Sequence, residues 1–337
     1  MALRLLRPIS ILILLSLILL PMQDQAQSGT PSSAAFGYGL RLELQDPATP
    51  QIIRLARDYR LEWVALDFSW QTYQPDPDQE PDWTQLDIVM QLAKKNQLAV
   101  MIGIVLPPAW AMLPAGPDPS AVQELCAQIL QRYPGIVRAL ELFPGANTHT
   151  GWGTDANPAA YSRLVCEINQ GLAGLDADVL LIGPGLSPAT SSDFDPLEFL
   201  QASYQAGVRA CLPVISIRLP TLESAPRSVP AVPTMQSLRF YETVRQVMLE
   251  QEHTQGVLWI SALDWQDRPD LPDSQRLEWV HQAYLLMRAQ LYMGAAFYQP
   301  HFTAHTEQVR LEIIQTIGQI IALENGQVTT YFEIPKE

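Results

Sequence analysis

Three acidic residues lie within or at the ends of apolar runs and could carry acid–base chemistry. They are Asp67 in W-V-A-L-D-F, Glu141 in L-E-L-F and Asp264 in W-I-S-A-L-D-W, and Asp267 is a further candidate. Paired carboxyl groups can cleave an acetal when one protonates the leaving oxygen and the other, about 5 to 5.5 Å away, attacks the carbon. This chemistry therefore depends on whether the fold brings two of these side chains together.

Metal and cofactor chemistry find no support in the sequence. The five histidines are scattered and form no H-E-x-x-H or similar cluster: they are His149, His253, His281, His301 and His305. Nucleotide-binding patterns such as G-x-G-x-x-G are absent as well. We expect no metal and no cofactor. The three cysteines are odd in number and have no metal-type spacing. Cys126 and Cys166 lie in expected helices and Cys211 at the start of an expected strand, so we expect buried free thiols, with a disulfide as the alternative.

The elements that must position the acidic residues follow from hydrophobic periodicity. Eight strand-like runs alternate with eight longer amphipathic stretches. The expected strands are 36–44, 62–68, 98–106, 136–142, 179–183, 210–217, 256–262 and 293–298. The expected helices are 49–59, 82–96, 120–132, 158–172, 196–205, 235–253, 274–290 and 306–324. Strict alternation predicts a parallel sheet, and eight right-handed units close into a barrel. We predict an α/β fold with a single (β/α)8 TIM barrel over residues 36–324.

The N-terminal residues have the layout of a secretory signal peptide. Arg4 and Arg7 precede an apolar run over 9–20, and the small residues Ala26 and Ser28 follow. A membrane-spanning helix needs about 20 apolar residues, so cleavage is favoured over retention as an anchor. We predict a signal peptide at 1–28, a short linker at 29–35, no membrane span in the mature chain, and secretion. We assign no role to the C-terminal tail at 325–337.

The charge of the chain excludes one class of partner. The formal net charge is −14. Nucleic-acid binding requires clustered Lys and Arg, so we expect no nucleic-acid partner.

A family resemblance begins at the second expected strand. The stretches W-V-A-L-D-F-S-W-Q-T-Y-Q-P (63–75), D-W-T-Q-L-D (82–87) and M-I-G-I-V-L-P-P-A-W (101–110) carry it. Together they resemble the clan-A glycoside hydrolases, in particular the β-xylosidase-like members of family 39. The resemblance covers nearly the whole mature chain. It implies the same barrel and a carbohydrate as the class of ligand.

The resemblance also implies that both catalytic glutamates are missing. The family's fourth strand ends like W-E-I-W-N-E-P-N, and L-E-L-F-P-G-A-N at 140–147 places Gly145 on its acid/base. The seventh strand reads like W-I-T-E-F-G-W, and W-I-S-A-L-D-W at 259–265 places Ala262 on the nucleophile. Gln74 stands for a further family Glu, and Arg218 for a family His. Gly and Ala can neither donate a proton nor attack the sugar.

Relocated carboxylates are the alternative source of chemistry. Asp264 shares the inward parity of Ala262 and lies roughly 6 to 7 Å nearer the mouth. Glu141 lies roughly 13 Å deeper than the vacant acid position, so we expect it to be buried and paired with an interior base. For Arg218 we expect an ion pair with a carboxylate such as Asp264, the alternative being an acidic sugar or another anion.

Aromatic residues cluster at the expected rim of the barrel. They are Trp70, Trp110, Trp152, Trp265 and Tyr298, with Asn147 and His149 as candidate polar companions. Such rings suit both sugar faces and ordinary packing. Trp63, Trp83, Trp259 and Trp279 are expected in the core or on helix faces.

The sequence thus predicts a secreted pseudoenzyme that binds a glycan or a cell-surface partner at the C-terminal mouth of its barrel. One alternative is an active retaining glycosidase that uses Asp264. Another is a structural or interaction protein whose mouth is closed by Pro144 and the Pro-rich segment 219–234. Restoring Gly145→Glu and Ala262→Glu together is expected to approach catalytic spacing.

Overall fold

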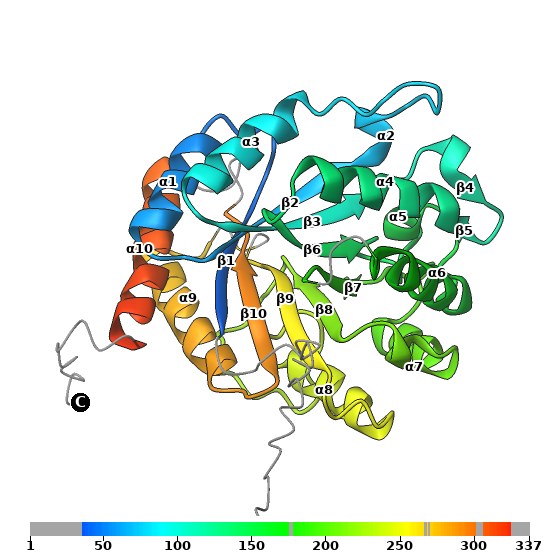
Figure 1. The fold of residues 1–337 in the computed structure, drawn as a ribbon. Coiled ribbons are helices and arrows are strands. Elements are labelled where there is room, and N and C mark those ends of the chain that lie inside the picture. The colour runs from blue at the N-terminus through cyan, green and yellow to red at the C-terminus, as the bar shows by residue number, and fades with distance from the viewer. Residues whose placement is uncertain (1–35, 175–177, 266–267, 269, 301–305, 325–337) are drawn as a thin grey trace, which may run out of the picture. The chain divides into compact units, whose positions relative to one another are not determined.

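A closed barrel of eight parallel strands forms the centre of the protein (Figure 1). The computed structural model describes residues 36–174, 178–265, 268, 270–300 and 306–324. The strands follow the order β1-β10-β9-β8-β7-β6-β3-β2 around the barrel. Their bounds are β1 Gly37–Leu42, β2 Trp63–Ser69, β3 Ala99–Val105, β6 Val137–Leu142, β7 Leu180–Leu186, β8 Val214–Leu219, β9 Val257–Leu263 and β10 Met293–Tyr298. Each overlaps a strand expected from the sequence, and the predicted barrel is confirmed.

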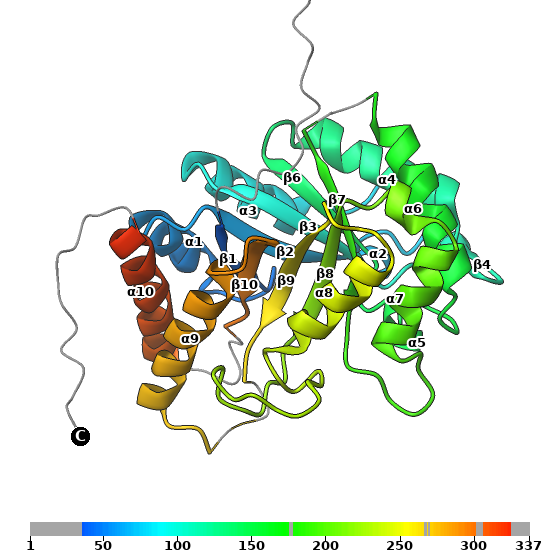
Figure 2. The same cartoon turned by 90° about the horizontal axis from the view of Figure 1, so that it is seen from below.

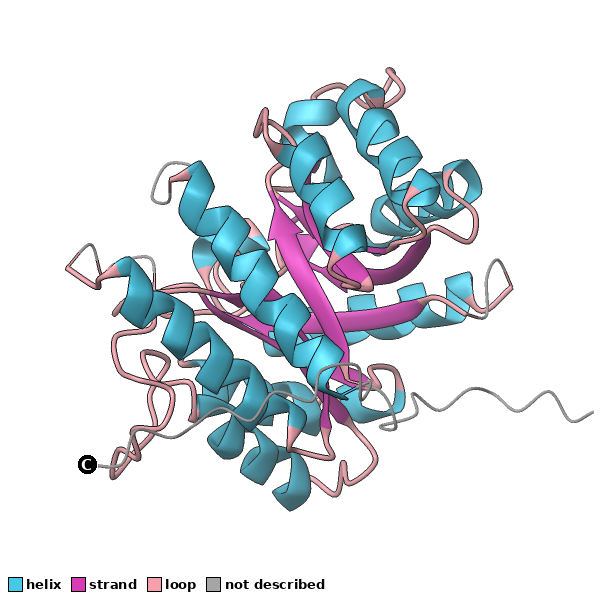
Figure 3. Ribbon diagram, turned by 90° about the vertical axis from the view of Figure 1, so that its left-hand side faces the viewer, coloured by secondary structure: helices cyan, strands magenta, loops and turns pink. Residues whose placement is uncertain are grey.

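Helices surround the barrel on its outer side (Figures 2 and 3). Their bounds are α1 Thr49–Asp58, α3 Thr84–Lys95, α4 Pro119–Arg132, α6 Pro158–Leu172, α7 Pro196–Gln205, α8 Phe240–Glu250, α9 Asp273–Arg288 and α10 Glu307–Glu324. The helix expected over 235–253 begins later, at Phe240, because residues 235–239 form turns. The loops at the C-terminal ends of the strands carry smaller elements: α2 Trp70–Tyr73, the 3-10 turn Ala109–Ala111, the hairpin strands β4 Met112–Leu113 and β5 Gly116–Pro117, and α5 His149–Trp152.

Three helices begin at an Asp-Pro or Asn-Pro pair, which explains why their starts are sharp. Asp118, Asn157 and Asp195 occupy the N-cap positions of α4, α6 and α7, and each side chain accepts a backbone N–H of the first turn. The following proline suits the first helical position because its missing N–H would have no partner there. These caps fix where the chain turns from the barrel mouth into each helix.

The interior of the barrel is divided into an apolar layer and a polar layer. The apolar layer consists of Ala65, Met101, Ala139, Ile182, Val214, Val257, Trp259, Ala295 and Phe297. Gly39 leaves room for one of these rings, because a Cβ at Gly39 would lie 2.4 Å from Phe297 Cδ1. Trp63 and Trp259 pack edge to face with ring centroids 5.2 Å apart. Bulky side chains thus fill the barrel as a core, so function is left to the layer above.

The expectation of three free thiols is wrong. Cys166 of α6 and Cys211, just before β8, form a disulfide with a Cα–Cα distance of 5.0 Å. The two cysteines are 45 residues apart in sequence, so their proximity follows from the packing of α6 and not from a spacing pattern. Cys126 remains a buried free thiol, as expected.

Several predictions concern residues outside the described part of the chain. These are the signal peptide at 1–28, the linker at 29–35, the tail at 325–337, and the side chains of Asp267, His301 and His305. Among the described helices, none combines the length and apolar character that a membrane crossing requires.

Candidate functional site

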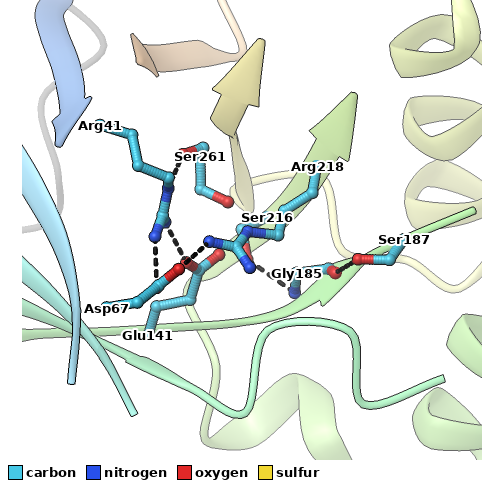
Figure 4. A network of polar contacts seen from close by, with 8 residues as sticks. All are labelled: Arg41, Asp67, Glu141, Gly185, Ser187, Ser216, Arg218 and Ser261. Carbon is cyan, nitrogen blue, oxygen red and sulfur yellow. Dashed lines mark hydrogen bonds and ion pairs between the residues drawn. The ribbon is translucent and has the colours of Figure 1, made fainter. Parts of the chain in front are cut away.

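A polar layer lies directly above the apolar layer, toward the C-terminal ends of the strands. Side chains alternate between the two faces of a strand, so residues two positions apart share a face. Asp67 follows Ala65 of the inner core by two positions, and Glu141 follows Ala139 in the same way. The residues of this layer are Arg41, Asp67, Glu141, Ser216, Arg218 and Ser261, and Figure 4 shows them converging from different strands. We call this set the polar layer.

Arg41 of β1 is the centre of the polar layer. Its Nη2 donates to Glu141 Oε2 at 2.6 Å, and both side chains are almost completely buried. Its Nη1 donates to Asp67 Oδ1 at 2.5 Å. Its Nε donates to the backbone oxygen of Ser261 at 2.6 Å. One guanidinium thus binds two carboxylates and a carbonyl, which satisfies a charge that would otherwise be costly to bury.

Arg218 of β8 binds the same Asp67 from the opposite side. Its Nη2 donates to Asp67 Oδ2 at 2.7 Å. The Asp67 side chain is 35% exposed and that of Arg218 17%, so this pair reaches solvent at the mouth. Burial acts to raise the pKa of Asp67, but the charges of Arg218 and Arg41 outweigh it and hold this pKa below its ordinary value. Asp67 is therefore an ionised acceptor and a poor proton donor.

The predicted ion pair between Arg218 and Asp264 is wrong. Asp264 does not bind Arg218; Tyr298 Oη donates to its Oδ1 at 2.6 Å, and Arg276 of α9 lies 3.3 Å from the same oxygen. Asp264 is fully buried. It follows β9, whose register shifts relative to both neighbouring strands after Ile260, so alternation along the strand does not predict the side on which Asp264 lies.

Glu141 pairs with an interior base, as expected, and that base is Arg41, which was not identified from the sequence. A signal for it existed, because Arg41 is the only charged residue in the run G-Y-G-L-R-L. Gly39, two positions before it, faces the inner core. The same alternation that places Asp67 inward therefore also places Arg41 inward.

Two glycines allow the polar layer to pack this closely. A Cβ at Gly103 of β3 would lie 2.4 Å from Asp67 Oδ1. A Cβ at Gly185 would lie 2.6 Å from the Cα of Pro144 and 3.1 Å from Glu141 Oε1. The chain at Pro144 and Gly185 thus lies against Glu141, which is inaccessible to solvent. A ligand at the mouth can meet Asp67 and Arg218 but not Glu141.

Gly145 and Ala262, which the resemblance aligns with the catalytic glutamates, are both buried. Gly145 follows β6 in a left-handed conformation, with φ +84°. Its N–H donates to the carbonyl oxygens of Gly185 at 2.8 Å and Pro184 at 3.1 Å. Ala262 of β9 is 1% exposed and pairs in register with Arg218 of β8. A register shift between Ile217 and Arg218 precedes this pair.

Four of the five rim aromatics have no exposed face. Trp70, Trp152, Trp265 and Tyr298 are each 0% exposed. The tryptophans use their indole N–H groups to hold loops together: Trp152 Nε1 donates to Ala115 O at 2.9 Å, and Trp265 Nε1 to Ser224 O at 3.0 Å. These rings therefore pack against loops, which was one of the two roles expected for them.

Trp110 differs from the other rim aromatics because it is only partly buried. Its Nε1 donates to the backbone oxygen of Gln74 at 3.2 Å, and its ring packs edge to face on Trp70. Gln74, which the resemblance aligns with a family Glu, is itself buried, and its side-chain oxygen accepts from Trp70 Nε1 at 2.8 Å. Trp110 is thus the rim aromatic with surface left for a ligand.

The two polar companions behave differently. Asn147 is fully buried, and its side-chain amide donates to the backbone oxygens of Ser187 and Phe194. It therefore joins the loop after β6 to the loop after β7. The His149 side chain is 65% exposed and lies 3.4 Å from Asp155. Only His149 is open to solvent.

The Pro-rich segment 219–234 follows β8 at the C-terminal end of the barrel, as expected. It contacts the seventh unit through a bridge between Thr221 and Trp265. Val229 and Val232 at its tip are 74% and 72% exposed. Within the described ranges, no group of three or more His, Cys, Asp or Glu residues has an arrangement that could hold a metal ion.

Comparison with known proteins relates the chain to glycoside hydrolases by fold alone. No protein-family profile matches the sequence, and no curated protein matches it. A family 39 glycoside hydrolase from the gut symbiont Bacteroides cellulosilyticus WH2 has a TM-score of 0.58 at 15% identity, over 80% of this chain and 57% of that one. A glucosidase from Croceicoccus marinus has a TM-score of 0.59 at 12% identity, over 80% and 63%.

A broad-specificity GH5-4 endoglucanase from Clostridium longisporum is similar in size as well as fold. Its TM-score is 0.56 at 11% identity, over 86% of this chain and 98% of that one. By contrast, the chain spans less than two thirds of the family 39 enzyme and of the glucosidase. The protein has a glycoside-hydrolase-like barrel.

Proposed function

We propose that this protein is a non-hydrolytic member of the glycosidase-like barrels that binds a glycan at its C-terminal mouth. The observation that carries the proposal is the pairing of both inward carboxylates with arginine: Asp67 binds Arg41 and Arg218, and Glu141 binds Arg41. A glycosidase acid must be protonated near neutral pH, which requires a raised pKa. Asp67 has a lowered pKa, and Glu141 is inaccessible to a substrate.

The proposal extends to the two positions that the family resemblance assigns to the catalytic glutamates. Gly145 lies in the turn after β6, and Ala262 lies near the C-terminal end of β9. Neither side chain has an ionisable group. Their positions at strand ends, where such barrels carry their chemistry, support the assignment.

Glycan binding is supported by the side chains that remain accessible to solvent at the mouth of the barrel. Asp67 and Arg218 offer hydrogen-bond acceptors and donors that reach solvent. Trp110 adds a partly exposed indole ring at the rim. Polar groups that fix orientation beside an aromatic surface are typical of small-molecule sites, and aromatic faces suit sugar rings.

Export to an oxidising compartment is part of the proposal. The Cys166–Cys211 disulfide supports it, because disulfides persist in extracytoplasmic proteins and are rare in the reducing cytosol. The signal-peptide pattern at 1–28 agrees with this location.

A second candidate function is a structural or interaction protein with a closed mouth. The complete burial of Trp70, Trp152 and Trp265 favours it, since these rings hold loops and offer no platform for stacking. The relocated glycosidase is less favoured, because Asp264 is buried against Tyr298 and Arg276, out of reach of a substrate.

The test combines a screen against aryl glycosides with a glycan array, both on the purified chain. Binding without turnover supports the proposal. Turnover that is abolished in Asp264→Asn but retained in Asp46→Asn contradicts the proposal. Asp46 is the matched control because it is also a buried carboxylate paired with an arginine, Arg310. A protein that shows no glycan binding and no turnover would favour the second candidate function, the interaction protein.

A further inference from the structure

We infer that Asp67 and Arg218 form a subsite for two adjacent hydroxyl groups of a neutral sugar. This inference deepens the proposed glycan binding and rests on it for the location of the ligand. The two side chains come from β2 and β8, which are not neighbours in the barrel, and they meet at 2.7 Å across its mouth. Figure 4 shows the two side chains pointing toward each other, with Glu141 beside them.

Asp67 supplies the acceptor of this subsite. Each of its oxygens accepts one arginine N–H, Oδ1 from Arg41 and Oδ2 from Arg218. A carboxylate oxygen has about two acceptor positions, so each retains capacity for a further donor. The 35% exposure of the side chain makes that capacity available from the mouth. The lowered pKa keeps it an acceptor at neutral pH.

Arg218 supplies the donor beside it. A guanidinium carries five N–H donors in a rigid plane, and Arg218 gives one group, Nη2, to Asp67. Among the described residues its Nη2 alone donates to the protein, while Nε is buried without a partner, so Nη1 is the donor left for a ligand. One sugar hydroxyl can therefore donate to Asp67 while its neighbour accepts from Arg218. The pair is already fixed in place, which lowers the entropic cost of binding.

The charge balance favours a neutral sugar over an acidic one. The two arginines of the polar layer, Arg41 and Arg218, are matched by the two carboxylates, Asp67 and Glu141, so no positive charge is left over. An acidic sugar would bring its carboxylate next to Asp67. The whole chain also has a formal charge of −14, which repels anions at long range. The acidic sugar considered for Arg218 is thus disfavoured.

The experiment follows the arginine side-chain Nε resonances of the purified chain by NMR during titration with millimolar glucose, mannose, galactose or glucuronate. We expect at least one neutral hexose to shift the Arg218 signal and to bind at least several-fold more tightly than glucuronate. We expect Asp67→Asn and Arg218→Gln each to weaken this binding about tenfold. The inference is wrong if glucuronate binds more tightly than the neutral sugars, or if no neutral sugar shifts the Arg218 signal.

Matched controls separate a binding role from a structural one. Asp87 and Arg132 form another Asp–Arg pair, with Asp87 32% exposed, on the outer helices α3 and α4. Asp87→Asn and Arg132→Gln should leave sugar binding unchanged. Arg218→Lys keeps the charge beside Asp67 but removes the fork of donors. It should fold as the wild type does by circular dichroism and still bind sugar more weakly, and unchanged binding by this variant would overturn the inference.

The outcome also separates the subsite from the proposed function. If array binding persists undiminished in Asp67→Asn, the protein binds glycans elsewhere and the subsite is wrong. If hexoses shift Arg218 in the wild type but no glycan on the array is bound, the subsite stands and the proposed glycan-binding role is wrong.

Discussion

Arg41 Nη2 lies 2.6 Å from Glu141 Oε2 inside the barrel, and the two side chains are 2% and 0% exposed. Removing one partner of such a buried pair leaves an uncompensated charge and costs about 3 to 5 kcal/mol. We therefore expect Glu141→Gln to lower the free energy of unfolding by about this amount, measured by urea denaturation. Glu252→Gln is the control: Glu252 pairs with Arg209 on the surface, with 84% exposure, and the expected loss is below about 1 kcal/mol. Equal losses would contradict a buried role for Glu141.

Gly145 adopts φ +84°, a conformation in which a side chain is strained. A Cβ there would also lie 3.3 Å from Ser187 Oγ and 3.4 Å from Thr148 Oγ1. We expect Gly145→Ala to cost about 1 to 2 kcal/mol of unfolding free energy. Gly174→Ala is the control, since it lies outside the left-handed region with no atom within 4 Å, and it should be nearly neutral.

The same strain applies to restoring both glutamates. Gly145→Glu with Ala262→Glu is expected to unfold at lower urea concentration than the wild type and to lack turnover of aryl glycosides. This expectation differs from the one drawn from the sequence, because the φ of +84° at Gly145 strains the backbone of any residue with a side chain. Turnover by the double variant would show that the loop after β6 rearranges.

His253 makes stability depend on pH. Its Nδ1 lies 2.8 Å from Tyr204 Oη. Burial, with the charges of Arg245 and Arg209, lowers its pKa to about 4. The unfolded chain, with a histidine pKa of about 6.5, then binds a proton more readily than the folded chain. Stability from this group is complete above about pH 6.5 and is lost as the pH falls toward 4.

We expect His253→Gln to lose less unfolding free energy than the wild type between pH 6.5 and 4.5, as measured by urea denaturation at each pH. His149→Gln, at an exposed histidine, should retain the wild-type dependence. An unchanged slope in His253→Gln would show that another group is responsible.

The disulfide can be checked by counting thiols. The chain has three cysteines, and Cys126 is fully buried, with its pKa raised to about 12 by burial. Without reductant we expect no reactive thiol in the folded protein and one after denaturation. Three should react after reduction. Three thiols in the denatured, unreduced protein would show that Cys166 and Cys211 are free.

Loss of the disulfide should also destabilise the fold. The bond closes a loop between residues 45 apart, and such links typically contribute about 2 to 4 kcal/mol. Cys166→Ser with Cys211→Ser is expected to lower the urea midpoint, and reductant should lower the wild-type midpoint to a similar extent. Reductant should then have no effect on the double variant.

The sequence by itself determined the barrel. The alternation along β2, the apolar runs of the other strands and the Asp-Pro or Asn-Pro helix starts are local patterns that can be read without knowing the partners of each residue. They also placed Asp67 and Glu141 on strands that run toward the mouth. The burial of Glu141 and its need for an interior base followed from the cost of burying a charge.

Only the tertiary structure decided which charges meet and which aromatics are covered. Arg218 and Asp67 are 151 residues apart, and closure of the barrel brings them together. Asp264 contacts Tyr298 and Arg276 of α9 beyond a shift in the register of β9 after Ile260, which no local pattern reveals. Trp152 and Trp265 bind loops that follow the neighbouring strands β3 and β8, and no local pattern in the sequence predicts those contacts. Local patterns determine which side chains of a strand share a face. Which side chains meet across a closed barrel depends instead on the register of all eight strands.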